Sequence, residues 1–92
     1  MKFPVGKIVV TDGIADRITK DFYFSEFVYV SLSRHKRCDW GDCCTEDKAL
    51  NDEALIDGDR LFSLYIFKDE TKIWIITEPD RSYTTILFPE EY

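Results

Sequence analysis

The side chains best suited to chemistry gather in one short stretch near the middle of the chain. Residues 34–42 read Arg-His-Lys-Arg-Cys-Asp-Trp-Gly-Asp, and Asp47 and Asn51 follow on the next segment. A histidine beside carboxylates can act as a general acid–base, because its ordinary pKa near 6.5 lies close to working pH. The candidate catalytic residues of such a site are His35, Asp39, Asp42 and Asp47.

The same stretch also admits a purely structural interpretation, which we favour. Asp39 and Asp42 would cap the turn and the following helix, Trp40 would anchor the loop in the core, and His35 would bond a backbone carbonyl. The carboxylate oxygens could instead hold Mg²⁺, a hard cation that prefers oxygen ligands. We predict neither a metal site nor a cofactor.

Three cysteines lie in or beside this stretch, at Cys38, Cys43 and Cys44. Their odd number argues against a disulfide framework. His35, Cys38 and one cysteine of the adjacent pair could together bind zinc. However, Cys43 and Cys44 do not match the C-x₂-C spacing of zinc sites. The beginning of the chain lacks the apolar stretch of a signal peptide, so we expect reduced thiols in a cytoplasmic protein.

A second candidate site lies at a predicted turn around Pro79. Asp80 can accept a hydrogen bond from the amide two residues on, and Arg81 can pair with Glu78 or with an acid of the helix layer. Arg81 and the hydroxyls after it could also bind a phosphate or carboxylate. Because no glycine-rich loop accompanies them, we favour a structural turn.

Aromatic side chains suggest an interaction surface. Trp40, Tyr65, Trp74 and Tyr92 are amphipathic groups of the kind enriched in interface hot spots. The residues that we predict to contribute to binding are Arg34, Trp40, Asn51, Arg60, Tyr65, Trp74, Glu78, Asp80 and Arg81.

Charge is divided unevenly along the 92 residues, which hold 12 basic and 18 acidic side chains for a net charge of −6. Residues 1–38 hold seven basic and four acidic side chains, a net charge of +3, and residues 39–92 have a net charge of −9. An electronegative surface can steer a basic partner toward it, although acids also simply keep small domains dissolved. The acidic total argues against a nucleic-acid binder that would use the basic run 34–37.

The first half of the chain predicts one strand and two helices that position these groups. Residues 5–10 are rich in β-branched side chains and predict a strand. Thr11 is placed to cap a helix over residues 12–20. Residues 22–32 fit either a strand by composition or a helix by spacing, and we choose the helix. Residues 38–44 read as a loop.

The second half predicts a helix followed by a meander of three antiparallel strands. Residues 46–57 form the helix, with Thr45 as its cap, Leu50 and Ala54 facing inward, and Gly58 ending it. The strands lie at residues 60–68, 72–78 and 83–88, joined by short turns, with the second strand central. The whole chain, residues 1–92, is predicted to be a single two-layer α+β domain. Its sheet is three- to four-stranded and mainly antiparallel, and two to three helices cover it.

Motifs spread over nearly the whole chain resemble a small bacterial family. Its members are borne on plasmids and other mobile elements, and are often labelled "plasmid related protein" or "type I restriction endonuclease subunit M". The resemblance is carried by Arg34-His35-x-x-Cys38-Asp39-Trp40-Gly41-Asp42, Glu46-Asp47-Lys48-x-x-Asn51, Gly58-x-Arg60-Leu61-Phe62-Ser63-x-Tyr65, Lys72-Ile73-Trp74-Ile75-Ile76-Thr77-Glu78-x-Asp80-Arg81-Ser82-x-Thr84-Thr85 and Pro89-x-Glu91-Tyr92.

The resemblance implies a mobile-element setting and no established activity. A methyltransferase subunit is not expected, because 92 residues cannot hold a cofactor-binding Rossmann domain and no G-x-G fingerprint is present. Cys38 stands where the family pattern leads us to expect glycine, so a positive φ at this position is in doubt.

From these observations we predict a non-catalytic interaction module of a mobile genetic element. Its partner would be a basic protein, such as a host nucleic-acid enzyme, and no membrane contact is expected. The alternative is a small hydrolytic enzyme with a His/Asp site around residues 34–51.

Overall fold

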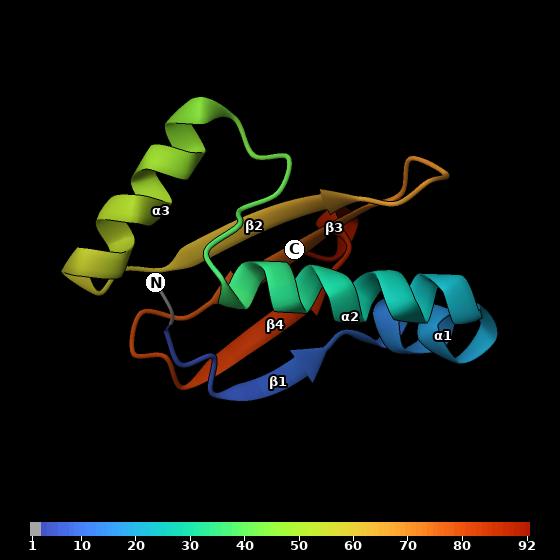
Figure 1. Cartoon of the computed structure of the whole chain (residues 1–92). Coiled ribbons are helices and arrows are strands. Elements are labelled where there is room, and N and C mark those ends of the chain that lie inside the picture. The colour runs from blue at the N-terminus through green and yellow to red at the C-terminus, as the bar shows by residue number, and fades with distance from the viewer. Residues whose placement is uncertain (1–2) are drawn as a thin grey trace.

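A four-stranded sheet with helices packed on one face organises the protein (Figure 1). The computed structural model describes residues 3–92. The strands are β1 (Lys7–Val10), β2 (Leu61–Ile66), β3 (Lys72–Thr77) and β4 (Tyr83–Leu87), and the helices are α1 (Asp12–Lys20), α2 (Phe22–Lys36) and α3 (Thr45–Asp57), followed by the short 3₁₀ turn η1 (Pro89–Glu91). This arrangement confirms the predicted α+β fold.

The strand order in the sheet is β1-β4-β3-β2. β2, β3 and β4 form the predicted antiparallel meander, and β1 adds a parallel strand beside β4. β1 and β2 are therefore the two edges of the sheet. No helix within residues 3–92 is long and apolar enough to cross a membrane.

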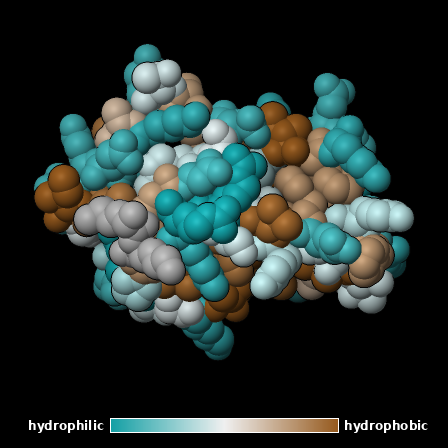
Figure 2. All heavy atoms as spheres, in the orientation of Figure 1, coloured by the Kyte–Doolittle hydropathy of each residue, from teal (hydrophilic) through white to brown (hydrophobic). Residues whose placement is uncertain are grey.

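The main core lies between the sheet and the first two helices. Ile14 of α1 and Phe24 of α2 are completely buried against sheet residues such as Tyr65, Ile73 and Ile75. These sheet residues alternate along their strands, as a half-buried sheet requires. On the outer side of α2, hydrophobic and hydrophilic side chains are interspersed (Figure 2).

The ambiguous aromatic segment is a helix, as predicted. Asp21 caps α2 by accepting a hydrogen bond from the Phe24 amide at 3.1 Å. The buried residues of α2 recur at helical spacing and are Phe24, Val28, Ser31 and His35. Because β-branched and aromatic residues serve both kinds of structure, the spacing and the cap decide the outcome here.

Helix α3 corrects two details of the prediction. Cys44, not Thr45, occupies the N-cap position, and its side chain makes no capping hydrogen bond. Leu50 was expected to face inward but is 61% exposed, whereas Asn51 and Ala54 are buried. The Asn51 amide is satisfied by the β2 backbone, and this contact sets the rotation of the helix. Gly58 ends α3 with a φ of 76°, as expected.

The loop before α3 and the helix itself cover the outer edge of β2. The Asn51 side chain donates to the Phe62 carbonyl at 2.6 Å and accepts from the Phe62 amide at 3.0 Å. The Asp42 amide donates to the Leu64 carbonyl at 2.7 Å. Gly41 is required for this approach, because its φ is 72° and a Cβ would clash with that carbonyl oxygen. These contacts hold α3 beside β2, at the sheet edge opposite β1 (Figure 1).

Candidate functional site

His35, the predicted acid–base, is completely buried between α2 and the sheet. Its Nδ1 is 2.5 Å from Ser63 Oγ and its Nε2 is 2.9 Å from Thr77 Oγ1. The rings of Phe3 and Trp40 pack edge-on against the imidazole. Among residues 3–92, none of its hydrogen bonds goes to a carboxylate or to the backbone carbonyl that the sequence led us to expect.

A chain of hydroxyl groups fixes the tautomer of His35. Thr84 Oγ1 donates its hydrogen to the Val5 carbonyl at 2.7 Å, so it can only accept from Thr77, 2.7 Å away. Thr77 has then used its own hydrogen and must accept from His35 Nε2–H. Nδ1 is left as an acceptor for the Ser63 hydroxyl. The network therefore requires a proton on Nε2, and in the neutral ring this is the Nε2–H tautomer.

Burial, together with a smaller effect of the positive charge of Arg81, lowers the pKa of His35 from its ordinary value of 6.5 to about 4. At neutral pH the ring is uncharged and shielded from solvent. It therefore cross-links α2 to β2 and β3, a structural function.

The carboxylates of the predicted catalytic group lie apart from His35. Asp39 forms a bidentate ion pair with Arg34, at 2.8 and 3.2 Å, and this guanidinium lowers the pKa of the carboxyl group. Asp42 is exposed in the loop, and Asp47 lies on α3. These carboxylates do not converge on His35, as the catalytic alternative would require. Within residues 3–92, no group of three or more histidine, cysteine or acidic side chains could hold a metal ion.

Two of the aromatic residues proposed for an exposed surface belong to the core instead. Tyr65 is completely buried, and its hydroxyl donates to the Asp39 carbonyl at 2.6 Å. Burial raises the pKa of this phenol. Trp40 is only 4% exposed, as its proposed anchoring role requires, and its indole donates to Asp52 at 3.1 Å. Neither ring is available to a partner.

Cys38 has a positive φ although it is not a glycine. Its φ is 66°, in the left-handed region that side chains rarely occupy. The doubt raised in the sequence analysis about a positive φ at this position was therefore wrong. Of the other two cysteines, Cys43 is buried, which raises the pKa of its thiol, and Cys44 is exposed.

Arg81 connects the β3–β4 turn to the carboxyl end of α3. Its guanidinium donates to the carbonyls of Asp59 at 2.6 Å, Ala54 at 3.1 Å and Glu78 at 3.2 Å. The expected pairing with a carboxylate is therefore replaced by carbonyl contacts, which suit a cation at a helix carboxyl end. Asp80 makes the predicted turn, accepting from the amide two residues on at 2.9 Å.

Replacing Arg81 by alanine should loosen α3 while leaving the sheet folded. Three carbonyls lose a charged donor, so we expect a loss of about 1–2 kcal/mol in the free energy of unfolding. Hydrogen exchange of the α3 amides should become faster, whereas that of β3 should change much less. Equal exchange in α3 for the variant and the parent protein would show that Arg81 does not hold the helix.

The residues of α3 and its two ends account for the net charge of the protein, because the charges of the rest of the chain balance. Residues 42–59 hold seven acidic residues and one basic residue, a net charge of −6, while the rest of the chain holds eleven of each. The acidic residues are Asp42, Glu46, Asp47, Asp52, Glu53, Asp57 and Asp59. In the part of the chain that the structure describes, none of them forms an ion pair with a lysine or arginine.

Helical periodicity collects three of these acids on one side of α3. Glu46, Leu50, Glu53 and Asp57 recur at intervals of four, three and four residues and are all exposed. We call this stripe the acidic flank. Lys48, the one basic residue of the helix, lies on the opposite side.

Beside the acidic flank lies a hollow of about 390 Å³, between α3 and the sheet face that α1 and α2 leave uncovered. We call it the aromatic groove. It is lined by Asp47, Leu50, Asn51, Arg60, Phe62, Trp74 and Tyr92. The Trp74 ring makes edge contacts with Phe62 and Tyr92, at centroid distances of 5.1 and 5.5 Å.

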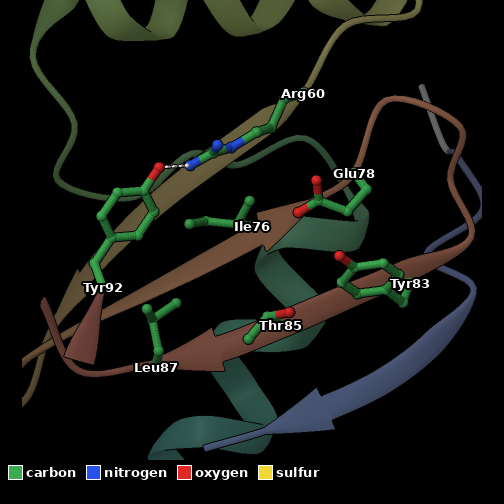
Figure 3. Close-up of a pocket in the computed structure, with 7 residues that line it drawn as sticks. All are labelled: Arg60, Ile76, Glu78, Tyr83, Thr85, Leu87 and Tyr92. Atoms are coloured by element: carbon green, nitrogen blue, oxygen red, sulfur yellow. Dashed lines mark hydrogen bonds between the residues drawn. The ribbon is translucent and has the colours of Figure 1, made fainter.

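A second hollow, of about 140 Å³, adjoins the groove on the same sheet face (Figure 3). Glu78 lines it, and Arg60 and Tyr92 line both hollows. Figure 3 shows Arg60 and Tyr92 reaching toward each other above the sheet, joined by a hydrogen bond of 2.7 Å. Of the predicted binding residues, the fold brings Asn51, Arg60, Trp74 and Glu78 to this face.

Comparison with protein-family models, with curated proteins and with solved structures finds no significant match. The function must therefore be inferred from the chain's own residues.

The sequence analysis missed the acidic flank and two walls of the groove. The spacing of Glu46, Glu53 and Asp57 is visible in the sequence and could have identified the flank. The contribution of Phe62 and Leu50 had no such signal, because it depends on how α3 is rotated against β2.

Proposed function

We propose that this protein is a non-catalytic interaction module whose acidic flank binds a basic protein partner. The observation that carries the proposal is the concentration of the entire net charge on residues 42–59, on side chains without ion-pair partners among the described residues. Such a surface attracts a positively charged protein over a distance and orients it on approach.

The attachment of α3 supports this function. Asn51 fixes the middle of the helix to β2, and Arg81 fixes its carboxyl end. A partner therefore meets a preorganised array of charges and does not have to order the helix on binding.

The aromatic groove supplies apolar contact next to these charges. Surface ion pairs alone contribute little to affinity, because water and salt screen them. Aromatic side chains in a hollow provide the desolvated contact on which interface affinity usually depends. Charge would thus attract and orient the partner, and the groove would retain it.

A nucleic-acid enzyme of a bacterial host is the class of partner that fits these properties. Its phosphate-binding surface is positively charged, and an acidic helix can compete with phosphates for that surface. The family resemblance points in the same direction, since proteins of mobile elements meet such enzymes in the cytoplasm of their host.

The proposal is tested by neutralising the acids of α3 in the full-length protein. We expect the quadruple variant Glu46→Gln, Asp47→Asn, Glu53→Gln, Asp57→Asn to weaken binding to purified basic nucleic-acid enzymes by about tenfold or more. Binding of the parent protein should weaken as salt rises from 50 to about 200 mM, because surface charges are screened. Biolayer interferometry at both salt concentrations provides the measurement.

The matched control removes the same charge elsewhere on the surface. Its substitutions are Asp12→Asn, Glu26→Gln, Glu70→Gln and Glu90→Gln, all at exposed positions. We expect this variant to retain most of the affinity. An equal loss of affinity in both variants would show that only the net charge of the protein matters, which contradicts a site on α3. No loss of affinity in the α3 variant would refute the proposal.

A further inference from the structure

The aromatic groove has the composition of a receptor for a cationic side chain. Electron-rich ring faces attract cations, and Trp provides the strongest such interaction. Phe62 and Tyr92 meet the Trp74 ring at interplanar angles of 71° and 67°, so both rings stand at a steep angle to that of Trp74. Leu50 adds an apolar surface for an aliphatic stem.

A carboxylate completes the arrangement. Asp47 lines the groove, is half-buried, and forms no ion pair with a described lysine or arginine. The acidic flank adds Glu46, Glu53 and Asp57 along the same side of α3. A cation that entered the groove would therefore find a ring face and a negative charge together.

The protein's own Arg60 shows what kind of group this surface accepts. Its guanidinium lies 5.3 Å from the centroid of the Tyr92 ring and donates to the Tyr92 hydroxyl. Arg60 thus occupies the Tyr92 end of the groove, between the two hollows. Trp74, which lines the groove together with Asp47, has no cation–π partner among the described residues.

We propose that the aromatic groove binds an arginine side chain of the basic partner, with its guanidinium against Trp74 and paired with Asp47. The hollow of about 390 Å³ lies at the small end of ligand sites, which suits one side chain. Arginine fits better than lysine, because its planar guanidinium stacks on rings and can bond a carboxylate with two N–H groups. This inference rests on the proposed function for the identity of the partner.

The experiment uses blocked single amino acids, so it does not depend on finding the partner. N-acetyl-arginine methylamide is titrated into the ¹⁵N-labelled protein, and the same titration is made with the citrulline derivative, a neutral isostere. We expect the arginine probe to shift the indole N–H signal of Trp74 and the backbone amides of Asp47 and Phe62. The affinity should be weak, on the order of 10 mM, and the citrulline probe should cause much smaller shifts.

Trp40 is an internal control, because its indole is buried in the core and should not respond. Trp74→Leu should reduce the arginine-induced shifts of Asp47 and Phe62 at least about fivefold, and Trp74→Phe, which keeps a ring, should retain part of them. Asp47→Asn should weaken binding several-fold. The spectrum of each variant reports whether it remains folded.

Equal shifts with arginine and citrulline, or unchanged arginine binding in Trp74→Leu, would overturn the inference. The proposed function would survive that result if the basic enzymes still lost affinity for the α3 quadruple variant. Conversely, the arginine probe could bind in the groove while binding to the basic enzymes did not depend on the acids of α3. That result would support the inferred arginine site and refute the proposed function.

Discussion

Replacing His35 by leucine should lower the free energy of unfolding by about 2–4 kcal/mol. Leucine fills much of the space but leaves the Ser63 hydroxyl and one side of the Thr77 hydroxyl without partners in the core. An unsatisfied buried polar group costs about 1–3 kcal/mol. Urea denaturation at pH 7.5, followed by tryptophan fluorescence, measures the change.

The control also removes the two hydroxyl groups that bond His35. The triple variant His35→Leu, Ser63→Ala, Thr77→Val leaves no orphaned donor on the β2 side and should be more stable than His35→Leu alone. A single variant within about 0.5 kcal/mol of the parent protein would show that the hydroxyl network does not stabilise the fold.

Acid should destabilise the protein through the same histidine. The pKa of His35 is about 4 in the folded protein, below its ordinary value of 6.5, so the unfolded chain binds the proton more tightly. Stability contributed by the neutral ring is fully present above pH 6.5 and is lost as the pH falls toward 4. The difference between the two pKa values corresponds to about 3 kcal/mol.

Denaturation curves between pH 7.5 and 4.5 test this dependence. His35→Leu lacks the titrating group and should show a much flatter profile in this range. The ion-paired Asp39 stabilises the fold throughout this range. Because Arg34 lowers its pKa below the ordinary 3.8, this stabilisation is lost only at lower pH. Parallel profiles for the parent protein and the variant would assign the pH dependence to other groups.

Local sequence signals predicted most of the fold. The Thr11 cap, the aromatic helix after Asp21, the αL glycine at residue 58 and the three-strand meander are all dictated by neighbouring residues. The predicted rotation of α3 was wrong, because a contact between residues distant in sequence sets the rotation of this helix. Periodicity ranked Leu50 as a core residue, whereas the Asn51 side chain meets the Phe62 backbone and turns Leu50 outward.

The candidate site was less predictable than the fold. His35 and Asp39 are four residues apart in the sequence, but one points into the core and the other pairs with Arg34 at the surface. From the sequence we located the negative charge only to residues 39–92, although a count over residues 42–59 narrows it to α3 and its two ends. Only the fold shows that Trp74, from a strand distant in sequence, lies beside that helix.

The central claim is that a basic partner binds at the acidic flank and the aromatic groove. Its most direct measurement is a ¹H–¹⁵N titration of the full-length protein with a short arginine-rich peptide. We expect the largest shifts at residues 46–57 and at Trp74, with all shifts reduced by added salt. Shifts concentrated on α1 and α2, or absent from α3, would contradict the claim.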